Sequence, residues 1–201
     1  DVVAAPHQTP EVRRVPLERL VLTIKALKYE RTAAAVLASL LEPPAPAAVR
    51  RAVDELVALG ALDVGAVAGA RFSAEALTPL GAHLAALPCD ARIGKFLLLG
   101  AVFGALDETL TIAATLTSRA PFVAPFAQRD AADAAKRLFA GASQSDHLAA
   151  LFAYREFDGT VGNAKFEFAR QNFLGIKSLQ TIAGLKRQLL ELLSDAGFAP
   201  R

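Results

Sequence analysis

Residues 77–95 read LTPLGAHLAALPCDARIGK, and they contain one helix end between two helix starts. Thr78 can cap the first helix, and Pro79 is favourable at its first position because that position needs no amide hydrogen bond. Pro88 ends this helix because its ring clashes with the preceding turn. Asp90 is well placed to cap the helix that follows. Two helices that meet so abruptly predict a rigid joint between two subdomains.

The chain before this joint predicts three amphipathic helices. Residues 1–16 hold three prolines and no apolar periodicity, which indicates an extended lead-in. Apolar side chains at helical spacing predict helices that begin near residue 17, after Thr32 and at Pro46. The side chains of the second helix expected to face the core are Val36, Leu37, Leu40 and Leu41.

Residues 61–77 predict a short β-hairpin with a Gly/Ala-rich turn. Three helices followed by a hairpin form a winged helix, which we assign to residues 17–88. The third helix of such a domain often reads DNA, but here Arg50 and Arg51 are offset by acidic residues at 54 and 55. A neutral helix gains little from counterion release, so the sequence favours a packing or protein-docking role.

Residues 89–201 predict an all-helical domain. Ile93 to Leu106 is apolar on nearly every side, which is typical of a central helix buried all round. Asp107 and Glu108 favour the start of the next helix. Residues 118–125 predict a loop braced by two prolines. Further helix starts, helix ends and turns are expected at Asp130, Gly141, Ser145 or Asp146, Asp158-Gly159 and Gly175.

Composition bounds the class of protein. With 201 residues, 53% hydrophobic and 21% charged, the chain can bury a real core and is not broadly disordered. A single cysteine excludes an internal disulfide and fits a reducing compartment. No apolar run reaches the length of a membrane span, and there is no signal-peptide pattern. Because methionine is absent and the chain starts at Asp1, we expect a fragment of a longer polypeptide.

No catalytic motif is present in the sequence. There is no phosphate-binding P-loop, and the Asp107-Glu108 pair is better explained as a helix start than as an ATPase acid pair. Ser145-Asp146-His147 holds the residue types of a hydrolytic triad, but adjacent side chains do not converge, so a helix cap is favoured. No histidine has a partner at metal-ligand spacing, and we interpret Cys89 as a small buried residue. We therefore assign no catalytic or metal-binding residue.

The net charge of +2 is concentrated near the end of the chain. A local excess of cations there is opposed only by Glu167 and is typical of a phosphate-binding surface or of ordinary solvated helix faces. On residue chemistry alone these two interpretations are equally favoured. The cations are Lys165, Arg170, Lys177, Lys186 and Arg187.

Ordered motifs over residues 12–193 carry a resemblance to a known family. They include Leu59-Gly-Ala-Leu62, Leu77-Thr-Pro-Leu-Gly81, Asp90-Ala-Arg-Ile-Gly-Lys95, Pro121-Phe122 with Pro125, Ser145-Asp-His-Leu148 and Asn172-Phe-Leu174. The chain resembles the helicase-associated region of DEAH-box/RNA helicase A-like ATP-dependent RNA helicases, which implies a winged helix followed by a helical, ratchet-like domain. Two RecA-like lobes would then precede Asp1, and an oligonucleotide-binding fold would follow Arg201.

The resemblance also implies where chemistry and binding occur. ATP and Mg would be bound by the RecA-like lobes, with no cofactor in this segment, and single-stranded RNA would pass the ratchet-like domain. The chain departs from the family at Phe157, where tryptophan is common, and in a wing that looks longer than usual. The residues that would face RNA are Ser118, Arg119, Arg170, Asn172 and Lys177. The residues of the joint are Pro79, Pro88, Asp90, Arg92 and Lys95, with Arg92 and Lys95 expected to pair with nearby carboxylates or carbonyls.

Two hypotheses follow from the sequence. The first is a non-catalytic module of a 3′-to-5′ RNA helicase, which contacts single-stranded RNA and the RecA-like lobes and oligonucleotide-binding fold of its own chain. The alternative is a helicase-derived scaffold that docks protein partners in a ribonucleoprotein assembly without unwinding. An intracellular location is expected, with the compartment and any activator or ribonucleoprotein partner left open, and no membrane contact is expected. A transcription-factor-like winged helix is disfavoured by the neutral third helix.

Overall fold

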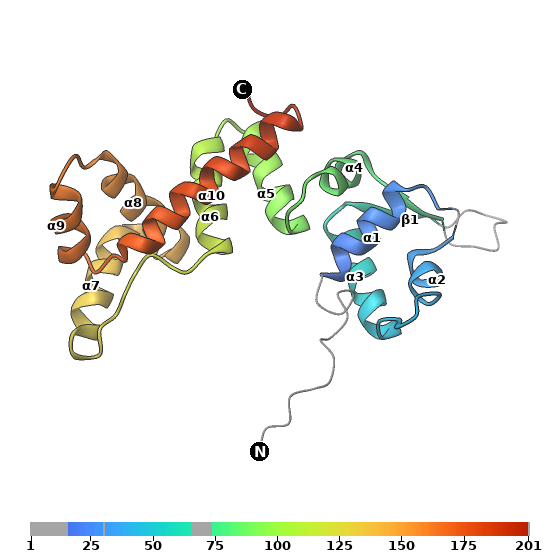
Figure 1. The fold of residues 1–201 in the computed structure, drawn as a ribbon, viewed down its shortest axis with the longest axis horizontal. Helices are drawn as coiled ribbons and strands as arrows, with labels where there is room; N and C mark the ends of the chain where they lie inside the picture. Colours follow the sequence, from blue (N-terminus) through green and yellow to red (C-terminus); the bar gives the residue numbers. More distant parts are fainter. Residues whose placement is uncertain (1–15, 30, 66–73, 201) are drawn as a thin grey trace, which may run out of the picture. The chain divides into compact units, whose positions relative to one another are not determined.

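The computed structural model describes residues 16–29, 31–65 and 74–200, and these residues are mainly helical. The expected lead-in over residues 1–15 and the turn of the expected hairpin, residues 66–73, lie outside the described residues. The chain divides into two compact units, residues 1–95 and 96–201, each with buried apolar side chains of its own. Figure 1 shows the elements of both units along the chain.

The first unit begins with three helices, α1 (Leu17–Ala26), α2 (Ala33–Leu37) and α3 (Pro46–Ala58). Strands β1 (Leu62–Gly65) and β2 (Ala74–Leu77) then pair antiparallel, with Leu62 opposite Leu77, and α4 (Pro79–Ala86) follows. Helix α1 packs against α3 and α4. Three helices and then a hairpin is the order that the sequence predicts. Buried side chains of this core include Val21, Leu22, Leu56, Leu62 and Leu84.

Thr78 connects the hairpin to α4. Its hydroxyl accepts a hydrogen bond from the amide of Gly81 at 3.0 Å and donates one to the carbonyl of Gly60 at 2.7 Å. The chain is so close here that a Cβ on Gly81 would lie 1.9 Å from the carbonyl oxygen of Ala61. Only glycine therefore allows α4 to begin at this distance from the end of α3.

Asp90 begins the next helix, α5 (Ala91–Val102). Its Oδ1 accepts hydrogen bonds from the amides of Arg92 at 2.8 Å and Ile93 at 3.3 Å, which is the predicted cap. Helix α4 ends before Pro88, as its ring requires. The division between the two units falls inside α5, after Lys95.

The prediction for the second helix was wrong beyond Leu37. Helix α2 ends there, and the side chains of Leu40 and Leu41 are 37% and 103% exposed. The amides of Ser39 and Leu40 donate three residues back, to Val36 and Leu37, so the chain tightens into 3₁₀-type turns. These tighter turns direct the side chains of Leu40 and Leu41 away from the core, ahead of the prolines at 43 and 44.

The second unit continues with helices α6 to α10. Helix α10 packs along α6, and α8 packs against α6 and α7. The most deeply buried large side chains include Thr111, Leu179, Ile182 and Leu193. The helices are α6 (Leu106–Thr117), α7 (Arg129–Ala140), α8 (Asp146–Gly159), α9 (Ala164–Gln171) and α10 (Ile176–Asp195), with short 3₁₀ turns η2 (Phe126–Gln128) and η3 (Gly141–Ser143).

Three predictions for this unit were wrong in detail. Helix α5 is not buried all round: it ends at Val102, and Val102 and Phe103 are 71% and 77% exposed, because Gly104 turns the chain with a φ of 71°. Asp130 lies in the first turn of α7 rather than at its cap, since the η2 turn places Gln128 there. Asp158 and Gly159 lie in the last turn of α8 instead of in a loop.

Candidate nucleic-acid interface

Two segments far apart in the sequence lie side by side in the second unit. Phe122 and Leu174 form an antiparallel backbone bridge. The amide of Val123 donates to the carbonyl of Phe173 at 2.8 Å, and the amide of Gly175 donates to the carbonyl of Pro121 at 2.8 Å. The loop 118–125, in which Ser118 and Arg119 are expected to face RNA, is therefore joined by two hydrogen bonds to the segment 172–177, which is also expected to face RNA. We call this contact the 122/174 bridge.

The bridge rests on a packed aromatic layer. The ring of Phe122 lies 6.0 Å from that of Phe139, which lies 6.3 Å from that of Phe168 in an edge-on arrangement. Helix α7 therefore contacts the loop through Phe139 and Phe122, and α9 contacts α7 through Phe168. On the other strand of the bridge, a Cβ on Gly175 would meet Val123 Cγ2 at 3.1 Å, so the two segments are in close contact.

The cations of the second unit differ in whether they are already paired. Arg170 donates to both oxygens of Glu167, at 2.8 and 3.2 Å, and Lys186 pairs with Asp107. Lys165 lies 4.0 Å from Asp158 and 5.2 Å from the ring of Phe157. In contrast, the exposed side chains of Arg119, Lys177 and Arg187 have no ion-pair partner among the described residues.

Ser118 and Asn172 use their polar side chains on their own helices. The hydroxyl of Ser118 donates to the carbonyl of Ala114 at 2.8 Å, at the end of α6. The amide nitrogen of Asn172 donates to the carbonyl of Phe168 at 2.9 Å, at the end of α9. These bonds satisfy carbonyls that a helix end leaves open, so both side chains orient the interface segments.

Asp107 and Glu108 belong to an ionic network that joins three helices. Arg155 of α8 hydrogen-bonds to both carboxylates, and Lys186 of α10 pairs with Asp107 while lying 5.4 Å from the ring of Tyr154. Burial by itself raises the pKa of Asp107, but hydrogen bonds from Lys186 and Arg155 outweigh it and hold this pKa below its usual range. A hydrogen bond from Arg155 likewise lowers the pKa of Glu108. The acid pair is thus held as structural carboxylates at the start of α6.

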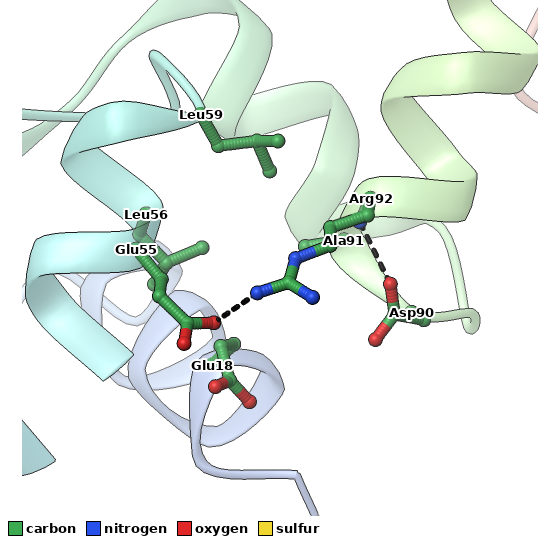
Figure 2. A pocket seen from close by; sticks show the side chains of 7 residues that line it. All are labelled: Glu18, Glu55, Leu56, Leu59, Asp90, Ala91 and Arg92. Atoms are coloured by element: carbon green, nitrogen blue, oxygen red, sulfur yellow. Dashed lines mark hydrogen bonds and ion pairs between the residues drawn. The ribbon is translucent and has the colours of Figure 1, made fainter. Parts of the chain in front are cut away.

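The joint residues make contacts within the first unit. Arg92 Nη2 donates to Glu55 Oε2 at 2.7 Å, and Lys95 Nζ donates to the carbonyl of Leu59 at 2.7 Å. A carboxylate and a carbonyl are the kinds of partner that we expected. Figure 2 shows Arg92 reaching from the start of α5 across a small pocket to Glu55 on α3. The pocket is about 80 Å³, well below the roughly 300 Å³ of a small-molecule site.

Among the described residues, no group of three or more His, Cys, Asp or Glu side chains could hold a metal ion. Over the same residues, no helix is both long enough and apolar enough to cross a membrane. Cys89 is half-buried, and burial raises the pKa of its thiol, so it is not an activated nucleophile.

The sequence reasoning missed two residues beside the interface loop. Phe126 follows Pro125 in the η2 turn, and its side chain is 89% exposed. The guanidinium carbon of Arg129 lies 5.4 Å from the centre of the Phe126 ring. The sequence signal for this contact was the spacing of three residues between Phe126 and Arg129, which favours a contact between the two side chains at a helix start.

Comparisons with known proteins match this chain to helicases. Residues 90–150 match the family described as the ratchet-like helicase-associated domain. The chain is 43% identical to a DExH-box ATP-dependent RNA helicase, DExH1, of Arabidopsis thaliana over 97% of its own length and 19% of that protein. It is 39% identical to the ATP-dependent RNA helicase dhx29 of Xenopus laevis, over 96% of the chain and 14% of that protein. It is 38% identical to the ATP-dependent DNA/RNA helicase DHX36 of Bos taurus, over 96% and 18%. The chain thus spans less than a fifth of each of these relatives.

Proposed function

Because this chain is a helicase-associated region of the kind found in DExH-box ATP-dependent RNA helicases, we propose that it is a non-catalytic module of a 3′-to-5′ RNA helicase. In this proposal residues 17–88 are a winged helix and residues 89–201 a ratchet-like domain. The module grips single-stranded RNA and couples it to the RecA-like lobes of the same protein. Those lobes bind ATP and Mg, an oligonucleotide-binding fold completes the RNA channel, and the protein acts inside the cell.

The 122/174 bridge is the observation that best supports the proposed RNA contact. It joins the loop 118–125 to the segment 172–177, and each segment carries an exposed cation without an ion-pair partner among the described residues, Arg119 and Lys177. Unpaired cations are available to phosphates without first breaking an intramolecular pair. Arg170 is already engaged by Glu167, so it contributes less, and Ser118 and Asn172 orient the two segments.

We assign the coupling between RNA binding and the RecA-like lobes to the joint of residues 77–95. Asp90 caps α5, Arg92 and Lys95 tie its first turns to α3 and the residue after it, and α5 continues without interruption past the division between the units. In this proposal the joint carries movement of an ATP-driven lobe to the surface that holds RNA. Pro79 and Pro88 define the helix boundaries on either side of α4.

The test replaces Arg119 and Lys177 together with Glu in the full-length protein that carries this chain. Affinity for single-stranded RNA, measured by fluorescence anisotropy, should fall at least about tenfold, since a charge-assisted contact contributes roughly 1.5 kcal/mol or more. RNA-stimulated ATP hydrolysis should fall with it. Replacing Arg50 and Arg51 on α3 with Glu makes the same charge change elsewhere and should leave RNA affinity unchanged.

Unchanged RNA affinity in the Arg119/Lys177 variant would overturn the assigned interface. A full-length protein without a P-loop and an acidic ATPase motif upstream, which binds protein partners but no RNA, would favour the scaffold instead. The 201-residue chain alone should hydrolyse no ATP, and measurable turnover by the purified chain would contradict the non-catalytic assignment.

A further inference from the structure

Phe126 is an aromatic side chain that is exposed to solvent. Its exposed fraction is 89%, although burying a phenylalanine is worth about 1.5–3 kcal/mol. The surrounding backbone is ordered by local contacts: Pro125 fixes the entry, and the amide of Gln128 donates to the carbonyl of Pro125 at 2.9 Å to close the η2 turn. The ring is thus positioned without being buried.

Arg129 covers part of this ring. Its guanidinium carbon lies 5.4 Å from the ring centre, within the range of a cation–π contact. Arg129 has no carboxylate partner among the described residues, so its charge remains available. With the guanidinium on one side and an exposed fraction of 89%, the ring offers an open face to a planar ligand.

We infer that Phe126 and Arg129 form a stacking platform for one base of single-stranded RNA. This inference rests on the proposed function and adds a base contact to the phosphate contacts of Arg119 and Lys177. Stacking on the open ring face accepts any base, because every base has a π face. The guanidinium of Arg129 strengthens the stack and attracts the adjoining phosphate.

The local surface favours a base over a protein as the ligand. The four nearest residues along the chain, Ala124, Pro125, Ala127 and Gln128, are all exposed, and none of them carries a large apolar side chain. A stable protein interface needs a continuous patch of about 800 Å² per partner, which one ring does not provide. Exposed Asp130 and Asp133 on the following turns repel phosphate, so the RNA backbone is directed toward the loop 118–125.

The experiment compares two single-stranded probes on the full-length protein. One is an ordinary RNA oligomer, and the other is an equally long chain of abasic phosphate–tetrahydrofuran units, which keeps the charges and lacks bases. Phe126→Ala should weaken binding of the RNA about 5- to 150-fold and leave binding of the abasic chain unchanged. Phe126→Trp should keep or increase RNA affinity. Leu138→Ala removes an 83% exposed side chain of α7 and should change neither affinity.

The outcomes separate this inference from the proposed function. If the wild-type protein binds neither probe, the proposed function fails. If it binds RNA but Phe126→Ala binds RNA equally well, only the platform is overturned. Equal losses for both probes would also overturn it, since they would indicate a general disturbance of the interface. A variant that keeps RNA affinity but loses association with a protein partner would assign Phe126 to protein docking instead.

Discussion

The Nζ of Lys25 lies 3.7 Å from Oε2 of Glu75, and these two side chains are only 9% and 8% exposed. The same Glu75 oxygen accepts a hydrogen bond at 2.7 Å from the amide of Ala33, the first residue of α2. Lys25 also donates to the carbonyl of Arg31 at 3.2 Å. A residue of β2 therefore helps to cap a helix that lies 42 residues earlier, and one buried ion pair ties α1, α2 and β2 together.

Replacing Glu75 with Gln should destabilise the first unit. Loss of one partner leaves the Lys25 ammonium buried without a carboxylate, which costs about 3–5 kcal/mol. Urea denaturation followed by circular dichroism measures the loss, and Lys25→Met should behave similarly. The double variant Lys25→Met/Glu75→Leu should lose much less than the sum of the two single variants. Additive losses would show that the two side chains are not energetically coupled.

Replacing Gly81 with Ala should destabilise the start of α4. The added Cβ would lie 1.9 Å from a backbone oxygen, so the backbone must move, at a cost of about 1–3 kcal/mol. Gly184→Ala is the matched control, because Gly184 lies inside α10 with no atom within 4 Å of the added Cβ. That control should gain about 0.5–1 kcal/mol. Equal stability of the two variants in denaturant would contradict the packing described for α4.

The ionic network at the start of α6 should make stability depend on acid. The folded protein holds the pKa values of Asp107 and Glu108 below those of the unfolded chain, so the unfolded chain binds more protons. The stabilisation is therefore fully present above about pH 4–5 and is lost as pH falls through the lowered folded values. Denaturation midpoints measured from pH 7 to pH 2 should show this loss.

The double variant Asp107→Asn/Glu108→Gln is the comparison for the acid dependence. It removes both titrating groups, so its stability should fall less steeply with acid than that of the wild-type protein. Both carboxylates are partly exposed, and added salt should therefore weaken the effect. An identical pH profile in the variant would show that other groups cause the acid loss.

The interface residues should separate into two classes by experiment. Ser118→Ala and Asn172→Ala each remove a hydrogen bond at a helix end and should cost about 1 kcal/mol of stability. Arg119→Ala and Lys177→Ala should leave stability nearly unchanged. Together they should reduce the slope of log affinity against log salt by about 1.4, since each single-strand phosphate contact contributes about 0.7. A salt slope equal to that of the wild-type protein would exclude phosphate contacts by these two cations.

Local sequence signals predicted much of the helical framework. Thr78, Asp90 and Ser145 accept the amide hydrogen bonds that their residue types favour at helix starts. Each signal depends on residues within one helical turn, which is why it can be read from the sequence. The failures at Leu41 and Phe103 have the opposite origin. Burial of an apolar side chain depends on which distant residues pack against it, and local sequence patterns do not identify those residues.

The contacts of the candidate site also fall into those that the sequence can predict and those that it cannot. The pairing of Arg170 with Glu167 was readable from their spacing of three residues on a helix. The 122/174 bridge was not readable, because it joins residues about fifty positions apart and involves only backbone atoms. The family resemblance pointed to both segments, and the structure adds the contact between them.

The separation of the two bridge strands has a consequence for folding order. Closing a loop of about fifty residues with two hydrogen bonds is entropically unfavourable until α7, α8 and α9 have packed and shortened the path between its ends. We therefore expect the surface proposed to hold RNA to assemble late in folding. Hydrogen exchange of the amides of Val123 and Gly175 should report on this surface separately, because we expect it to follow local opening of the bridge rather than unfolding of the helices.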